Sequence, residues 1–137
     1  ELVLATRVTV DALWGAPPLM ALGELGGLVP VDAYGGAFVG RGFVRRRFIG
    51  ESKALATAEL RFMPLERKFG RHSGGFGFEV FAEAGAVAMR LADLYRYRHI
   101  SGGPGILMIW DNFAVFRVEV GLSREGAALY LQSEYAF

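Results

Sequence analysis

Arg41, Glu59 and Glu83 carry the clearest chemical possibility in this 137-residue chain. Arg41 lies in a glycine-rich segment, and each glutamate lies on the polar side of a later segment in which polar and apolar residues alternate. A guanidinium is a planar fork of donors that can bind two carboxylates at once. The chemistry predicted is therefore charge pairing between a loop and two strands, with no bond made or broken.

Other side chains that could act in catalysis or bind a metal lack the neighbouring groups that such a site needs. Ser101 and Ser123 come without a base or an oxyanion arrangement, so the chain is not expected to be an enzyme. His72 and His99 are far apart without ligand spacing, and the chain has no cysteine, so neither a metal nor another cofactor is expected. The run Gly102-Gly103-Pro104-Gly105 has no lysine after it and is interpreted as a kinked strand or a place of close backbone approach.

Six segments of the chain alternate between polar and apolar residues, which predicts β-strands. The fold predicted is all-β, an antiparallel up-and-down meander of about six transmembrane strands that is part of a larger outer-membrane β-barrel. The second strand is expected to end at Met63-Pro64-Leu65, because proline cannot donate to a β-ladder, and Glu66–Gly75 to be a connection. Arg90–Arg98 is expected to be a loop, with a short helical turn as an alternative. The segments are Leu2–Trp14, Lys53–Phe62, Phe76–Ala88, Ile100–Trp110, Phe113–Ser123 and Leu129–Phe137.

Residues 15–52 differ from the predicted strands, because they show no periodicity and are rich in glycine and proline. A structureless loop of this length is uncommon in a compact soluble domain, whereas long loops on one rim are normal for outer-membrane barrels. The segment is interpreted as a long extracellular or lumen loop. Its cluster Arg45-Arg46-Arg47 is expected to be solvated, with binding of phosphate or a lipid headgroup as the alternative.

One face of every predicted strand is nearly free of charge, although the pattern alone does not say which face is inside. Aromatic residues near strand ends, such as Trp14 and Trp110, favour an apolar face toward lipid, because a membrane girdle requires them there. Mean hydropathy is +0.30, yet no run approaches the ~20 apolar residues of a spanning helix, so a membrane would be crossed by strands. The other face holds Arg7, Asp11, Lys53, Glu59, Arg61, Glu79, Glu83, Arg117, Glu119 and Glu134.

From Arg41 onward the chain resembles the BamA/TamA family of outer-membrane assembly and translocation barrels, also called bacterial surface antigens. The likeness covers about residues 35–137, the family's C-terminal barrel region. The family's loop motif is an aliphatic residue and then Arg-Gly-Phe or Arg-Gly-Tyr, and this chain has Gly40 before Arg41-Gly42-Phe43. Glu59-Leu60-Arg61-Phe62 resembles the end of the family's next strand. Phe81-Ala82-Glu83-Ala84-Gly85 resembles a Phe-x-Asp motif in the strand after it, with glutamate in place of aspartate.

In that family the loop folds back into the lumen, and its arginine pairs with acids on the inner wall. The resemblance implies this role for Arg41, with Glu59 and Glu83 as partners. It also implies that Gly42 lets the backbone pass closely and that Phe43 packs the loop tip against the wall. The end of the chain resembles the terminal signal of many outer-membrane proteins, which assembly machinery reads, at Leu129, Leu131, Tyr135 and Phe137.

The leading hypothesis is that residues 1–137 are the C-terminal part of a transmembrane β-barrel in the bacterial outer membrane. The resemblance implies that it inserts or translocates other outer-membrane proteins, with the loop held by Arg41 and an edge strand near the chain end that pairs with client strands. Known membrane barrels start at about eight strands, so upstream sequence, another chain or oligomerisation would complete this one.

The expected partners are outer-membrane lipids (lipopolysaccharide and phospholipid), the remaining barrel strands and client outer-membrane proteins. Nucleic acid is not expected, because the net charge is only +1. Two alternatives stay open. The first is a passive pore or structural barrel subunit of an envelope complex, and the second is a soluble β-barrel that binds a ligand.

Overall fold

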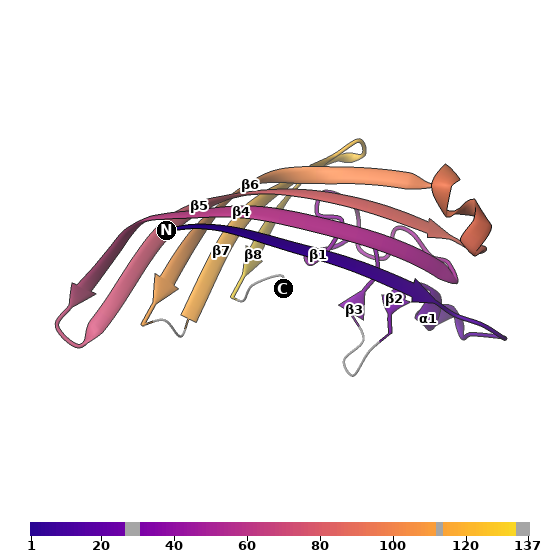
Figure 1. The fold of residues 1–137 in the computed structure, drawn as a ribbon, viewed down its shortest axis with the longest axis horizontal. Coiled ribbons are helices and arrows are strands. Elements are labelled where there is room, and N and C mark those ends of the chain that lie inside the picture. Colours follow the sequence, from indigo (N-terminus) through magenta and orange to yellow (C-terminus); the bar gives the residue numbers. More distant parts are fainter. Residues whose placement is uncertain (27–30, 112–113, 134–137) are drawn as a thin grey trace.

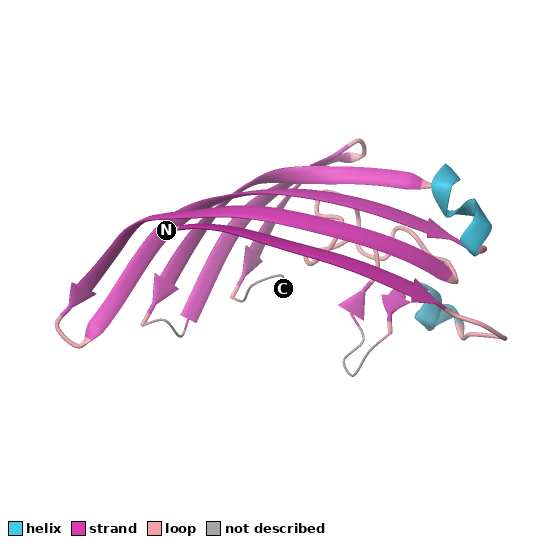
Figure 2. Cartoon of the chain, in the orientation of Figure 1, coloured by secondary structure: helices cyan, strands magenta, loops and turns pink. Residues whose placement is uncertain are grey.

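The protein is built on one curved sheet of six long antiparallel strands (Figures 1 and 2). The computed structural model describes residues 1–26, 31–111 and 114–133. The strands cover Leu2–Ala12 (β1), Ser52–Phe69 (β4), His72–Ala88 (β5), Arg98–Trp110 (β6), Ala114–Ser123 (β7) and Gly126–Gln132 (β8). Their order in the sheet is β1-β4-β5-β6-β7-β8, which confirms the predicted all-β meander. The sheet is not closed, since β1 and β8 form its two edges.

Continuous antiparallel pairing aligns residues of like parity into rows across the sheet. Leu2 pairs with Phe62 at one end of β1, and Ala12 pairs with Ser52 at the other, without a shift between them. A typical row continues through four strands, from Val8 over Ala56 and Ala84 to Ile100. The two faces of the sheet therefore differ consistently in composition.

The convex face of the sheet is apolar and exposed. Phe78 is 49% exposed, Val118 40% and Leu131 75%. None of the outward residues in 2–12, 54–62, 76–86, 100–108, 114–122 and 127–131 is charged. The buried charged residues of the strands lie on the concave face, where the segment between β1 and β4 covers them (Figure 1), whereas Arg98 at the start of β6 is exposed on the convex side.

The second strand is longer than the sequence predicts. Met63-Pro64-Leu65 does not end it, because β4 continues to Phe69 and pairs again with β5 from Leu65 onward. The register shifts between Phe62 and Leu65, and a proline is tolerated at such an irregularity because no ladder donor is needed there. Most of the expected connection Glu66–Gly75 is consequently strand, with a tight turn around Gly70.

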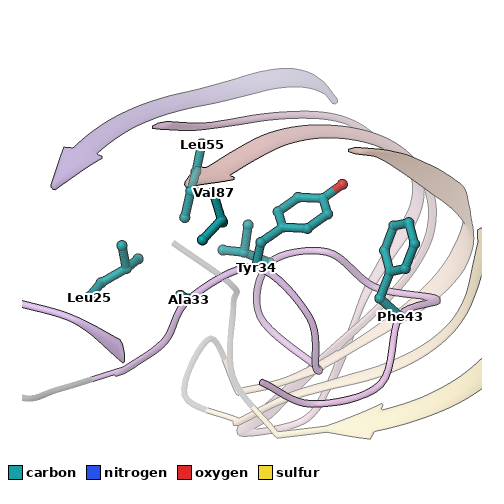
Figure 3. Close-up of a cluster of buried hydrophobic side chains, with 7 residues drawn as sticks. Leu25, Ala33, Tyr34, Phe43, Leu55 and Val87 are labelled. Atoms are coloured by element: carbon teal, nitrogen blue, oxygen red, sulfur yellow. The ribbon is translucent and has the colours of Figure 1, made fainter. Parts of the chain in front are cut away.

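The segment between β1 and β4 lies against the concave face. Residues 15–52 were expected to form a structureless loop, and this expectation is wrong. The segment contains a short helix Leu19–Leu22 (α1) and two brief strands, Glu24–Leu25 (β2) and Val31–Asp32 (β3), which pair with each other. Figure 3 shows the buried hydrophobic cluster between this segment and the sheet. The cluster consists of Leu25, Ala33, Tyr34, Val39, Phe43, Leu55 and Val87.

The connection between β5 and β6 forms a 3₁₀ helix, Leu91–Arg96 (η1), which is the helical turn considered as an alternative to a loop. It packs against β4 as well as β5. In residues 1–26, 31–111 and 114–133, no helix is long and apolar enough to span a membrane.

Candidate functional site: a loop arginine held by carboxylates of the sheet

Arg41 lies at the centre of the concave face and is completely buried. Its Nη2 is 2.8 Å from Glu59 Oε1 on β4 and 2.8 Å from Glu83 Oε1 on β5. Its Nη1 pairs with Glu119 Oε1 on β7. The structure thus brings Arg41 together with both glutamates that the sequence indicated, and it adds a third. One guanidinium links three strands of the sheet to the loop.

Glu83 also binds the backbone of the loop. The Gly40 and Arg41 N–H groups each donate to Glu83 Oε2 at 2.8 Å, and Arg41 Nε donates to Glu83 Oε1 at 3.0 Å. Ser101 Oγ on β6 donates to the same carboxylate at 3.2 Å. Beside these contacts, the Arg41 guanidinium stacks on the Phe81 ring, 3.5 Å from its centroid, where a cation–π attraction adds to the ion pairs. Phe81 and Glu83 of one strand therefore hold the arginine from two directions.

A second buried guanidinium, that of Arg117 on β7, extends the network. Its Nη2 lies 3.2 Å from Glu59 Oε1, 3.0 Å from Glu79 Oε1 and 2.5 Å from Glu119 Oε1. Arg61 Nη2 contacts the other oxygen of Glu59 at 2.5 Å. Charges withdrawn from water are tolerated only when they are paired and hydrogen-bonded. The interleaved guanidinia and carboxylates pair these charges between the sheet and its loop, although Glu79 Oε2 has no hydrogen bond within the described residues.

Glycines make room for this network. In the row that crosses β5, β6 and β7, Gly105 pairs with Glu79 on one side and Glu119 on the other. A Cβ at Gly105 would lie 2.6 Å from Glu79 Oε1 and 3.0 Å from Glu119 Cγ. At Gly103 a Cβ would overlap the carbonyl oxygen of Val120. The interpretation of this glycine run as a place of close approach is therefore confirmed.

The tip of the loop lies directly on β7. A Cβ at Gly121 would be 2.6 Å from both the Arg41 carbonyl carbon and the Gly42 nitrogen. Gly42 has a φ of +100°, a conformation that suits glycine, and its N–H donates to Tyr130 Oη of β8 at 2.8 Å. Ser123 Oγ donates to the Gly42 carbonyl at 2.8 Å. Two strands at the C-terminal edge thus fix the backbone that presents Arg41.

Aromatic packing fixes the rest of the loop. Phe43 is 2% exposed and contacts the rings of Tyr34, Phe48 and His99. The Tyr34 ring covers Gly85 on β5, where no side chain could fit beneath it, and its hydroxyl donates to the His99 carbonyl at 3.2 Å. His99 stacks on Phe48 at 3.6 Å between ring centroids. Both His99 and Ser101 therefore have structural partners.

The outer part of the loop has its own ion pairs. Asp32 accepts hydrogen bonds from Arg45 and from Arg46, and Arg46 also pairs with Glu24. Partial burial raises the pKa of Asp32, but the two arginines outweigh it and hold that pKa below its ordinary value. Two members of the arginine cluster are thus paired within the loop instead of being only solvated, although Arg45 remains 71% exposed.

The base of the loop is held separately, by a fully buried lysine. Lys53 Nζ on β4 donates to Asp11 Oδ2 on β1 at 2.9 Å and to the carbonyl of Ala21 in α1 at 3.2 Å. With this contact, side chains from all six long strands take part in holding the loop or its anchors on the concave face.

The remaining predicted residues lie away from the network. Trp14 is 86% exposed beyond the end of β1, and Trp110 is 52% exposed at the end of β6, at opposite ends of the sheet. Leu129 and Leu131 are exposed on the convex side of β8. Tyr135 and Phe137, the last members of the predicted terminal signal, lie outside the described residues.

Glu79, Glu119 and Arg117 are charged members of the site that the sequence did not single out, although it placed all three on the polar face. Alternation gives the face of the sheet on which a side chain lies but not its position along the strands relative to its neighbours. The signal that could have found them is the glycine at position 105, which opens space between two acidic residues. Among the described residues, no cluster of His, Asp or Glu has the arrangement of a metal site.

Comparisons of the chain with protein-family models, with curated proteins and with solved structures found no match in any of the three. The resemblance of Arg41-Gly42-Phe43 to the BamA/TamA family therefore stays a prediction.

Proposed function

We propose that this chain is the C-terminal part of an outer-membrane β-barrel that inserts or translocates other outer-membrane proteins. The observation that carries the proposal is the sidedness of the sheet. The exposed convex face is apolar on all six strands and carries charge only near strand ends, at Arg67 and Arg98, while guanidinia and carboxylates are buried on the concave face under the chain's own loop. A soluble sheet protein has the opposite arrangement, with its apolar residues inside.

The dimensions support a membrane location. A transmembrane strand needs about 9–11 residues. β1 has 11 residues, β6 has 13 and β7 has 10. The exposed aromatic residues Trp14 and Trp110 at opposite ends of the sheet suit the two girdles of a barrel. Further strands would extend the wall from the free edge of β1.

The loop supports a role in assembly or translocation over a passive open pore. A pore needs an unobstructed interior, whereas here the loop fills the concave face and is anchored through Arg41 to three carboxylates. The Arg-Gly-Phe motif and its acidic partners resemble those of assembly and translocation barrels. The seven-residue edge strand β8 offers unpaired backbone groups, which are a template for an incoming strand.

The experiment has two stages and uses the full-length protein. First, the protein is extracted in detergent and run on a gel with and without heating. A folded barrel is expected to change its mobility on heating, and a protein that is soluble without detergent would contradict the membrane location.

Second, the protein is depleted from its host, and the folded amounts of other outer-membrane proteins are measured. A fall in those amounts, restored by the parent but not by Arg41→Met, is expected of an assembly or translocation factor. Unchanged amounts, together with ion conductance of the purified protein in planar bilayers, would favour the passive pore instead. Tight binding of a small ligand by a soluble form would favour the ligand binder.

A further inference from the structure

A shallow trough runs along the convex face, where the outward residues become small on two neighbouring strands. We call it the alanine trough. Bulkier outward residues stand on either side, with Val8 76% exposed on β1 and Ile100 72% exposed on β6. Two adjoining hollows share Val8, Ala56, Ala84 and Ile100, so the depression is continuous. Its floor consists of Ala54, Ala56 and Ala58 of β4 and Ala86, Ala84 and Ala82 of β5, which pair in that order.

The positively charged side chain of Arg98 lies at one end of the alanine trough. Arg98 pairs with Ala86 in the first row of the floor, on the same face, and it lines the hollow with Leu94 and Tyr95 of η1. Arg98 is exposed. Within residues 1–26, 31–111 and 114–133, it has no hydrogen bond or ion pair, whereas nearby Arg96 lies 3.7 Å from Asp93 and donates to Tyr95 Oη. An apolar channel that begins at an uncompensated guanidinium is complementary to an amphiphile with an anionic head.

The dimensions of the trough fit a hydrocarbon chain. From the first to the last of its three rows the trough spans four residue steps along each strand, about 13 Å at about 3.3 Å per residue. This length is close to the ~15 Å that one leaflet contributes to the hydrocarbon core. The floor is only two strands wide, about 5 Å between strand axes, whereas a helix with its side chains is about 10–12 Å across. A single acyl chain suits this width better than a partner helix.

The position of η1 indicates the leaflet. The long connections of the sheet, residues 13–51 and the segment with η1, are at one end, while the turns after Phe69 and Trp110 are at the other. In outer-membrane barrels the long connections are extracellular. Arg98 would therefore lie at the outer leaflet, at the level of the lipid headgroups.

We propose that the alanine trough binds one acyl chain of a phosphorylated glycolipid of the outer leaflet, whose phosphate pairs with Arg98. This inference rests on the proposed membrane location. Leu94 and Tyr95 close the upper end, so the lipid is held at a fixed place between β1 and β6. An arginine fits a phosphate through two parallel hydrogen bonds. A lipid bound at this place would cover the part of the sheet where the outward side chains are only alanine.

The test uses full-length protein purified in detergent, titrated with lipid A and followed by native mass spectrometry. Arg98→Gln removes the cation, and the pair Ala56→Leu with Ala84→Leu fills the trough with exposed apolar side chains that a bilayer tolerates. Each change is expected to weaken lipid A binding by fivefold or more. Two matched controls are expected to stay within twofold: Arg90→Gln, an exposed arginine of the same connection outside the trough, and Val118→Leu with Val120→Leu on β7.

Four outcomes would overturn the inference for a protein that still shows a heat-modifiable band. They are parent-like binding by both trough variants, an equal loss in the Arg90→Gln control, displacement of the lipid by inorganic phosphate alone, and capture of a protein by a photo-crosslinker at position 84. Equal affinity of the parent for phosphatidylcholine would also contradict the role of Arg98. If the parent shows no heat-modifiable band and stays soluble without detergent, the proposed membrane location fails and this inference fails with it.

Discussion

Replacing Arg41 by methionine tests the buried ion network most directly. The side chain keeps much of its length but loses the charge that Glu59, Glu83 and Glu119 share at zero exposure. Glu59 and Glu119 retain contacts with Arg117, at 3.2 and 2.5 Å. Glu83 loses its ion pair and keeps only neutral donors such as Ser101. Breaking a buried pair costs about 3–5 kcal/mol, so we expect the lower end, about 3 kcal/mol.

A second substitution separates charge from packing. In Arg41→Met with Glu83→Gln, no isolated carboxylate remains, and the glutamine oxygen can still accept from the loop backbone. We expect the double variant to regain about 1–2 kcal/mol relative to Arg41→Met, a coupling typical of contacting residues. Arg45→Met is the matched control, because Arg45 is 71% exposed and pairs with Asp32. Its expected cost is below about 1 kcal/mol.

The measurement is the free energy of unfolding in lipid vesicles, from urea titrations followed by tryptophan fluorescence, with protease protection of the loop as a second readout. Arg41→Met is expected to unfold at lower urea and to expose the loop. If Arg41→Met and Arg45→Met were equally stable, or if Glu83→Gln made the double variant worse, the reasoning about an uncompensated buried carboxylate would be refuted.

Three further predictions address the outward face, the loop tip and one turn. Val118→Arg on the convex face should cost about 2–4 kcal/mol in vesicles near the bilayer midplane, against less than about 1 kcal/mol for Val3→Arg on the concave face; equal costs would contradict lipid exposure. Gly121→Ala should increase protease cleavage of the loop, because its Cβ would lie 2.6 Å from the loop backbone, and an unchanged cleavage rate would contradict that contact. Hydrogen bonds from the His72 ring and the Ser73 backbone hold the pKa of Asp111 below its ordinary value of about 3.9. The contact therefore stabilises the turn above about pH 3.9 and is lost as the pH falls through the lower folded pKa, which a carboxyl NMR titration would show; a midpoint at or above 3.9 would contradict it.

The strands and their faces could be predicted from the sequence, because period-two alternation is a local property of each segment. The predicted ends of the strands were less accurate where pairing with a neighbouring strand overrode a local sequence rule. Pro64 was expected to end β4, yet pairing resumes at Leu65 because β5 offers a partner on the other side of the irregularity. At the other end of the chain, the expected start at Leu129 was late, since β8 begins at Gly126.

The candidate site was predicted in part. Arg41, Glu59 and Glu83 were selected from residue type, face and resemblance, and the structure places them in contact. Glu119 and Arg117 were assigned only to the polar face. Which charges on that face lie at the same height depends on the pairing register of four strands, and register is a property of the whole sheet.

The amino-acid sequence by itself determined that this chain forms amphipathic strands with one uncharged face, because each residue's side follows from its own position. Only the tertiary structure decided which face is covered. The loop could fold onto the charged face because Gly121 and Gly85 leave space for its backbone and for Tyr34, and because three carboxylates from distant strands converge on one guanidinium. Such convergence depends on sheet curvature and on contacts between residues up to 78 positions apart, which no local pattern contains.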